Sequence, residues 1–141
     1  MKSIQTEIII NAPREKVWQL LTDFKNYPTW NTFIVSIEGE LKEGGRLKNK
    51  MVVDGKRQTF RPKIQKVIPN EYLEWLGKVP LGMFNGQHYF QLETVGNGQT
   101  KLTHGEYFSG WLRGMIMKKI GAATRRGFIK MNEELKKLAE G

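Results

Sequence analysis

The chain has 141 residues, the size of one ordinary domain, so residues 1–141 are expected to form a single domain. It contains no cysteine and only 2 histidines, which excludes disulfides and thiolate chemistry and leaves too few nitrogen ligands for a typical transition-metal site. The formal net charge is +9, and the segment from Trp111 onward holds 8 basic and 3 acidic residues, so the excess charge is greatest near the end of the chain.

The first predicted element is a strand over residues 4–10 that places Ile4, Thr6, Ile8 and Ile10 on one side. A helix is predicted from Arg14 to about Phe24, because apolar residues recur at helical spacing after Pro13, a residue suited to a first helical turn. Pro28 prevents a simple continuation, so residues 26–30 are expected to form a short, separate helical turn.

From Ile34 the hydrophobic period changes to two, and strands are predicted near 34–40, 46–53, 58–67, 72–78, 86–94 and 100–108. Turn-forming residues separate these segments, and such short connections favour a meander in which consecutive strands pair. Pro62 lies inside one of the segments and pushes it toward a sheet edge or a bulge.

After Gly110 the period becomes helical, and one helix is predicted from about Trp111 to Ala139, about 40 Å long at 1.5 Å per residue. Its predicted apolar stripe consists of Leu112, Ile116, Ile120, Ala123, Gly127, Met131, Leu135 and Leu138. An antiparallel sheet must bury one face, and this helix is the only element large enough to cover it. The sequence therefore predicts an α+β fold with about seven antiparallel strands, two short helices after the first strand and one long C-terminal helix.

Several motifs occur in a characteristic order: Asn11-Ala12-Pro13 with Lys16-Val17-Trp18, Tyr27-Pro28-x-Trp30-Asn31 before Phe33, Gly86-x-His88-x-Phe90-x-Leu92, and Leu102-Thr103-His104-Gly105-Glu106 before Phe108. Together they resemble the START-like, or SRPBCC, superfamily and its polyketide cyclase/dehydratase branch, over nearly the whole chain. Thr32 departs from the usual pattern, since it occupies the Pro position of the motif Trp-Asn-Pro-Phe.

The resemblance implies a helix-grip fold, in which a curved sheet wraps around the C-terminal helix and a deep cavity lies between them. Members of the superfamily include lipid carriers and aromatase/cyclases, and they share no catalytic triad. The resemblance therefore supports a pocket better than it supports a particular reaction.

The last predicted hairpin brings the polar candidates together. If Leu92 lies opposite Leu102, then His88 faces Glu106 and both lie on the apolar, concave face with Phe90, His104 and Phe108. Buried polar groups need partners, so a contact between His88 and Glu106 is expected. Three interpretations remain open: a polar anchor for a hydroxyl or carbonyl group of a ligand, a catalytic acid–base pair, or a purely structural pair that fixes the hairpin.

Small residues in the middle of the long helix, Gly121 to Thr124 with Gly127 one turn on, allow either close packing on the sheet or space for a ligand. Inward-facing aromatic residues are expected to line the cavity, although some of them are expected to belong to the ordinary hydrophobic core. The candidate ligand-binding residues are Trp30, Phe33, Phe60, Trp75, Phe84, His88, Phe90, His104, Glu106, Phe108, Ile120, Thr124 and Phe128, with His88 and Glu106 as weak catalytic candidates.

The preferred functional interpretation is the binding or carriage of a small lipophilic molecule without a cofactor or metal ion. One alternative is a cyclase/dehydratase-like enzyme that uses the same cavity, so whether the chain is an enzyme stays open. Another is a module that binds an anionic membrane surface or an acidic partner through the basic residues of the last helix, namely Arg113, Lys118, Lys119, Arg125, Arg126 and Lys130.

The sequence also suggests where the chain acts. Glu7 stands where a signal peptide would need apolar residues, and no apolar run of about 18 residues occurs, so a cytoplasmic location without stable membrane insertion is expected. Basic residues with interleaved aromatics are too scattered to predict a nucleic-acid surface.

Overall fold

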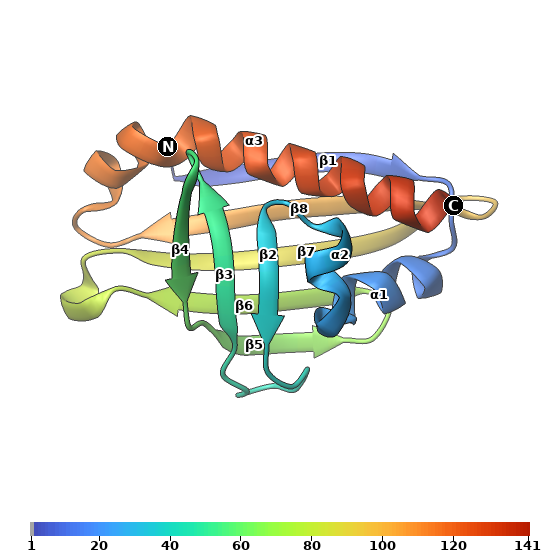
Figure 1. Ribbon diagram of the computed structural model, residues 1–141, viewed down its shortest axis with the longest axis horizontal. Coiled ribbons are helices and arrows are strands. Elements are labelled where there is room, and N and C mark those ends of the chain that lie inside the picture. The colour runs from blue at the N-terminus through green and yellow to red at the C-terminus, as the bar shows by residue number, and fades with distance from the viewer. Residues whose placement is uncertain (1) are drawn as a thin grey trace.

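A computed structural model describes residues 2–141 and shows one long helix lying along a curved β-sheet (Figure 1). In chain order its elements are β1 (Ser3–Ile10), α1 (Arg14–Thr22), η1 (Phe24–Asn26), α2 (Tyr27–Trp30), β2 (Ile34–Glu38), β3 (Lys48–Val53), β4 (Lys56–Phe60), β5 (Lys63–Ile68), β6 (Tyr72–Lys78), η2 (Pro80–Gly82), β7 (Asn85–Gly96), β8 (Gln99–Ser109) and α3 (Arg113–Glu140). This arrangement confirms the predicted α+β helix-grip fold.

The strands form two antiparallel groups. One has the order β1-β8-β7-β6-β5 and the other the order β2-β3-β4. The segment before β3 joins the two groups, because an isolated bridge pairs Arg46 with Lys63 and the Leu47 N–H donates to the Pro62 carbonyl at 2.8 Å. Figure 1 shows that the strands β2 to β4 run crosswise to the five-stranded group and that α3 lies along the five-stranded group.

The predicted strand over residues 58–67 is wrong, because two strands of different groups occupy it. β4 ends at Phe60 and β5 begins at Lys63, with Arg61 and Pro62 between them. Proline has no N–H to donate to a ladder, so pairing stops there and the chain changes direction. The structure consequently has eight strands where about seven were predicted, and β4 and β5 do not pair with each other as a meander would require.

The beginning of the chain follows the sequence pattern. Ile4, Thr6 and Ile10 are buried along β1, which pairs with β8, the last strand of the chain. The first helix ends at Thr22, two residues earlier than predicted, and Pro28 lies in the first turn of the separate helix α2. These elements close one end of the sheet.

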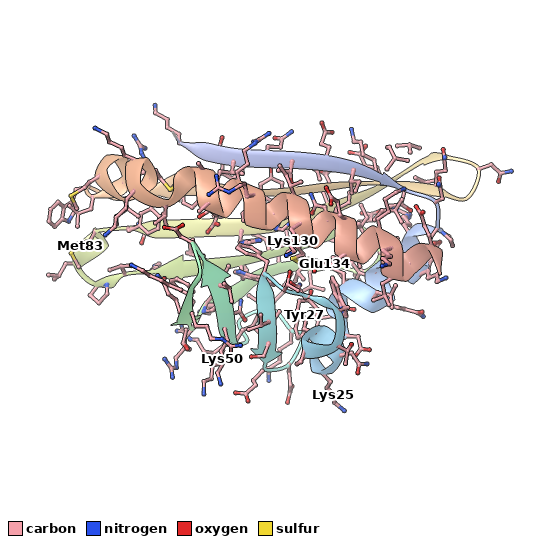
Figure 2. The ribbon with its side chains drawn as sticks, turned by 45° about the horizontal axis from the view of Figure 1, so that its top comes forward. Lys25, Tyr27, Lys50, Met83, Lys130 and Glu134 are labelled. Carbon is pink, nitrogen blue, oxygen red and sulfur yellow. The ribbon has the colours of Figure 1, made fainter. Side chains whose placement is uncertain are left out.

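Thr32, which departs from the motif of the superfamily, ties α2 to the last helix. Its backbone N–H and its hydroxyl donate to the two carboxylate oxygens of Glu134 at 3.0 and 2.8 Å. Figure 2 shows Glu134 on the side of α3 that approaches the segment containing Tyr27. A proline at position 32 would remove both donors, so the departure supplies a contact between α3 and the loop before β2.

The buried face of α3 differs from the predicted stripe. Met131 and Leu135 are buried as predicted, but Leu138 is exposed and the earlier members of the stripe are only half-buried. The buried face instead consists of Met117, Gly121, Thr124, Phe128, Met131, Asn132, Leu135 and Ala139. It includes two polar residues, Thr124 and Asn132, which hydrophobic spacing cannot detect. Within residues 2–141, no helix is both long and apolar enough to cross a membrane.

Candidate functional site

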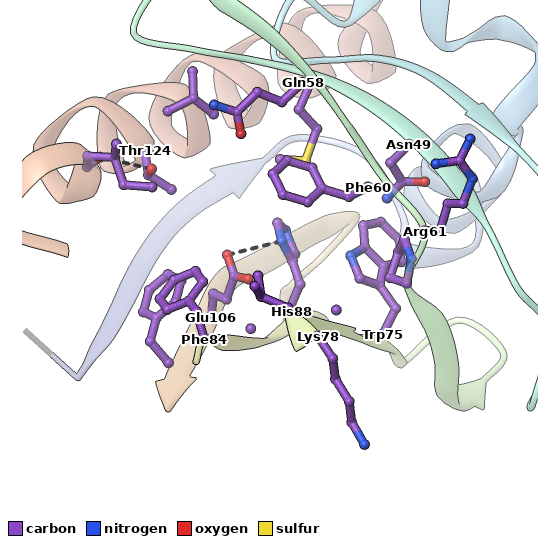
Figure 3. Close-up of a pocket in the computed structure, with 18 residues that line it drawn as sticks. Asn49, Gln58, Phe60, Arg61, Trp75, Lys78, Phe84, His88, Glu106 and Thr124 are labelled. Atoms are coloured by element: carbon purple, nitrogen blue, oxygen red, sulfur yellow. Dashed lines mark hydrogen bonds and ion pairs between the residues drawn. The ribbon is translucent and has the colours of Figure 1, made fainter. Parts of the chain in front are cut away.

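A cavity of about 190 Å³ lies between the inner face of β3 and β4, the strands β6 to β8 and the first half of α3. Figure 3 shows its walls, with Thr124 of α3 on one side and Asn49, Phe60 and Arg61 on another. The cavity exists because β3 and β4, which precede the break at Pro62, belong to a separate group of strands and form a wall of their own opposite the five-stranded group. The helix therefore covers a hollow at this end of the molecule.

Eight of the predicted ligand-binding residues line this cavity: Phe60, Trp75, Phe84, His88, Glu106, Phe108, Ile120 and Thr124. They come from β4, β6, β7, β8, α3 and the loop before β7, so distant parts of the sequence meet here. The rings of Phe84 and Phe108 stack with centroids 5.6 Å apart and form one apolar wall.

The other predicted residues, Trp30, Phe33, Phe90, His104 and Phe128, do not line the cavity. Phe90, His104 and Phe128 are fully buried in the adjoining core, where the His104 ring stacks on Phe128 with centroids 4.1 Å apart. Phe33 packs against Phe128, and Trp30 packs against Tyr27. Alternation along a strand identifies the inward face but not whether a residue lies over the cavity or over the solid core.

Of the cavity wall formed by β3 and β4, sequence reasoning identified only Phe60. Asn49, Met51 and Val53 alternate along the inner face of β3, and Gln58 lies opposite Met51 on β4. The alternation within the predicted strand 46–53 was a usable signal for this wall. Gly77 and Gly86 were also missed, and they lie opposite each other on β6 and β7, where the absence of side chains widens the cavity.

The predicted register of the last hairpin is confirmed, since Leu92 lies opposite Leu102 and His88 lies opposite Glu106. The Nδ1 atom of His88 is 3.4 Å from Oε1 of Glu106 (Figure 3). The imidazole is almost completely buried and the carboxylate is 16% exposed, so Glu106 is the accessible member of the pair. Its carboxylate lies over Gly86, at a spot that any Cβ on residue 86 would overlap.

Behind this pair, a chain of hydrogen bonds leads into the core. Nε2 of His88 lies 2.7 Å from Nε2 of His104, and Nδ1 of His104 lies 2.8 Å from Oδ1 of Asn132 on α3. The Asn132 amide donates to Oγ1 of Thr6 at 2.8 Å, and the Thr6 hydroxyl donates to the His104 carbonyl at 2.8 Å. Three strands and the long helix therefore hold one continuous polar network in apolar surroundings.

The hydrogen-bond partners in this network determine which atoms of the side chains carry protons. The single hydroxyl proton of Thr6 goes to a carbonyl, so Thr6 accepts from the Asn132 amide nitrogen, and the Asn132 oxygen must face His104. His104 accordingly carries its proton on Nδ1 and accepts at Nε2, which makes Nε2 of His88 the donor. The contact between His88 Nδ1 and Glu106 then requires one proton, held by either the imidazole or the carboxyl group.

Electrostatics favour the neutral form of His104. Burial lowers the pKa of His104 well below its ordinary value, and the neighbouring His88 lowers it further, while the hydrogen bond to Asn132 opposes the shift. A neutral imidazole at position 104 agrees with the assignment of a single proton to Nδ1. His88, which contacts Glu106 at the cavity, therefore has a neutral imidazole of fixed orientation, that of His104, on its other side.

The cavity wall also carries two cations, Arg61 and Lys78, both exposed. Among the residues that the structure describes, neither has a carboxylate within 4.0 Å, so both charges are free to attract an anionic group. In the same part of the chain, no three His, Cys, Asp or Glu side chains come together in a way that could hold a metal ion.

Comparisons with known proteins agree on the architecture. A family model described as polyketide cyclase / dehydrase and lipid transport matches residues 1–140. A search of curated proteins gives no match.

Among solved structures, the chain is similar to the Zhui aromatase/cyclase from Streptomyces sp. R1128, with a TM-score of 0.80 and 15% sequence identity, covering 99% of this chain and 93% of the other. It is also similar to a START superfamily protein from Mycobacterium smegmatis, with a TM-score of 0.78 and 17% identity, covering 99% of this chain and 98% of the other. At these identities the likeness concerns the fold.

Proposed function

This chain belongs to the polyketide cyclase / dehydrase and lipid transport family, and from that premise we propose that it binds a small lipophilic molecule in the cavity between the sheet and α3. The observation that carries the proposal is the composition of the cavity wall. Apolar side chains from three directions surround the space, and the polar pair of His88 and Glu106 occupies one side. Binding sites for small molecules typically combine an apolar lining with a few oriented polar groups.

The size of the cavity limits the ligand. An engineered apolar cavity of about 150 Å³ holds benzene, and the space here is about 190 Å³. It therefore suits a substituted ring, with any longer portion of the molecule extending past Arg61 and Lys78. Apolar burial, at about 25 cal/mol per Å², would supply most of the affinity, and Glu106 with His88 would fix the orientation.

Native mass spectrometry of protein purified from its own host tests this proposal. We expect a co-purifying small molecule that is released on denaturation and is lost from a variant whose cavity is filled by Ile120→Phe. The proposal fails if the wild-type protein carries no molecule and also binds no hydrophobic ring compound in titrations.

A second candidate function is catalysis of the cyclase/dehydratase type in the same cavity. The observation that favours it is the distance of 3.4 Å between Nδ1 of His88 and Oε1 of Glu106, because an imidazole and a carboxyl group in contact can accept and return a proton at a bound substrate. Replacing Glu106 with Gln distinguishes the two functions. An enzyme would lose turnover of a polyketide or aromatic substrate while still binding it, whereas a carrier would show only weaker retention of its ligand.

A third candidate is association with an anionic lipid surface, and the end of the molecule beside the cavity favours it. Leu81 and Trp111 are 87% and 70% exposed, and the Trp111 indole N–H donates to the Leu81 carbonyl at 3.2 Å. Leu81 has a φ of 64°, a conformation that leucine rarely adopts, so the backbone is held in a costly shape that keeps this side chain in solvent. The cations Lys118 and Lys119 lie exposed on the first half of α3.

Vesicle sedimentation tests this third function. We expect binding to anionic vesicles that weakens with salt and is reduced by Trp111→Ser, while Ile129→Ser, at an exposed apolar position within α3, has no effect. Absence of binding at low salt would exclude a lipid surface and leave an acidic protein partner as the alternative for the basic residues.

A further inference from the structure

Asn49 is a polar residue in a position that otherwise favours apolar side chains. It lies on the inner face of β3, in line with Met51 and Val53, and it is only 1% exposed. It pairs with Phe60 on β4, and Figure 3 shows it beside Phe60, Arg61 and Trp75, on a different wall from Glu106. A leucine or methionine would satisfy the period-two pattern of β3 at this position.

Neither polar atom of the Asn49 side chain has a hydrogen-bond partner within residues 2–141. The other buried asparagines differ in this respect. Asn31 lacks a partner for Nδ2 only, since its Oδ1 accepts the N–H groups of Phe33 and Ile34, and both amide atoms of Asn132 are paired. A buried amide without partners destabilises a protein, so its presence in a cavity wall points to a group that pairs with it when the cavity is filled.

We propose that Asn49 is a ligand anchor that selects ring compounds carrying a primary amide or a lactam. The inference rests on the proposed function of ligand binding in this cavity and names the chemistry of the ligand. The free Nδ2 of Asn49 donates and the free Oδ1 accepts, so the complementary group offers a carbonyl oxygen and an N–H on the same side. An amide of this kind satisfies both atoms at once, whereas a ketone satisfies one and a hydrocarbon neither.

Access to Asn49 depends on its neighbour Phe60. This residue belongs to the edge strand β4, in which every residue is exposed, and its own side chain is 38% exposed. The ring can therefore move aside as a ligand enters. The ring of the ligand would then lie between Phe60 and Trp75, with its amide against Asn49 and its other substituents toward Glu106.

The test is an NMR titration of the whole chain with benzamide, acetophenone and ethylbenzene, three probes of similar size. In the wild-type protein we expect benzamide to shift the side-chain NH₂ resonances of Asn49, and ethylbenzene to leave them unchanged. We expect Asn49→Leu to weaken benzamide binding by about tenfold or more, as loss of a paired buried group does. The variant should bind ethylbenzene at least as well as the wild type, and acetophenone should show an intermediate loss.

Met51→Leu is the matched control, since it alters the same wall of β3 without a polar group, and it should change the affinities for benzamide and ethylbenzene by the same factor. Equal effects of Asn49→Leu on these two probes, or Asn49 resonances that benzamide does not move, would overturn the proposal while cavity binding stands. If none of the probes binds the wild type, the proposed function fails as well. The wild-type resonances alone separate these outcomes if Asn49→Leu does not fold.

Discussion

The Nε2 atoms of His88 and His104 lie 2.7 Å apart, so the two buried imidazoles are joined by one hydrogen bond with a single proton between them. Because Nδ1 of His104 donates to Oδ1 of Asn132, Nε2 of His104 is the acceptor of this bond and Nε2 of His88 is the donor. His88 consequently turns Nδ1 toward Glu106, the only acidic side chain of the cavity wall among the described residues.

The state of His104 predicts how stability depends on pH. Burial and the neighbouring His88 lower the pKa of His104, so below about pH 6.5 the unfolded chain binds a proton that the folded chain does not. The free energy of unfolding should therefore fall as the pH drops below about 6.5, by up to about 1.4 kcal/mol per pH unit from this group, and the fall should end at the lowered pKa. Above pH 6.5 the contribution of His104 is constant.

Urea denaturation between pH 5 and 8 measures this dependence. The variant His104→Asn retains His88 and Glu106, and it should show a smaller loss of stability between pH 6.5 and 5. Identical slopes for variant and wild type would show that His104 is protonated in the fold.

Gly86 is predicted to control the position of Glu106. A Cβ at position 86 would overlap the Glu106 carboxylate, so Gly86→Ala should push this side chain away from His88. Gly77→Ala is the control, because Gly77 lies opposite Gly86 and its Cβ would meet only Pro62, at 4.0 Å. We expect the ¹⁵N chemical shifts of the His88 ring to change in Gly86→Ala and to stay unchanged in Gly77→Ala. Unchanged shifts in both variants would mean that Glu106 does not hold the ring.

Two isoleucines of α3 allow the cavity to be filled selectively. Ile120 lines the cavity, whereas Ile129 is 40% exposed on the same helix. Ile120→Phe should occupy part of the space and weaken binding of a hydrophobic ring probe by about tenfold or more, while Ile129→Phe should leave the affinity within about twofold. Fluorescence titration with the probe measures both, and equal affinities in the two variants would place the probe elsewhere.

Substitution of two glycines of α3 tests separately the effects of close packing and of helix propensity on stability. A Cβ at Gly127 would overlap the buried ring of Phe33, which packs against Phe128, so Gly127→Ala should lower the free energy of unfolding by about 1–3 kcal/mol. Gly114→Ala meets no atom within 4 Å and should raise it by up to about 1 kcal/mol, because alanine favours the helix. Urea denaturation of both variants checks the signs, and stabilisation by Gly127→Ala would indicate that Phe33 has room to move.

The order of elements and the register of the last hairpin could be predicted because each depends on a local pattern. Leu92 and Leu102 fix the inward face of β7 and β8, and the pairing of His88 with Glu106 follows from them. The stronger contact of His88, with His104, was not predicted. Whether two inward-facing rings touch depends on side-chain rotation and on what the helix brings to meet them.

Asn132 and Asn49 show a second reason why part of the site could not be predicted from the sequence. Hydrophobic spacing identifies a face by its apolar members, so a polar residue on that face is taken for a solvent-facing one. Asn132 is buried through its bonds to His104 and Thr6, which lie far away in the sequence. Asn49 lies in the cavity wall that β3 and β4 form, and the spacing of apolar residues along a single strand does not reveal that a polar residue belongs to that wall.

Because the pairing of strands breaks at Pro62, the cavity is lined by two structural units whose residues can be substituted independently. The side contributed by β3 and β4 carries Asn49 and Phe60, while the proton-holding chain from Glu106 to Thr6 belongs to the five-stranded group and α3. Substitutions in β3 and β4 could alter which molecule binds without disturbing the hydrogen-bond network from Glu106 to Thr6 on the other side of the cavity. A relative with another preference would then be expected to differ most between residues 48 and 60.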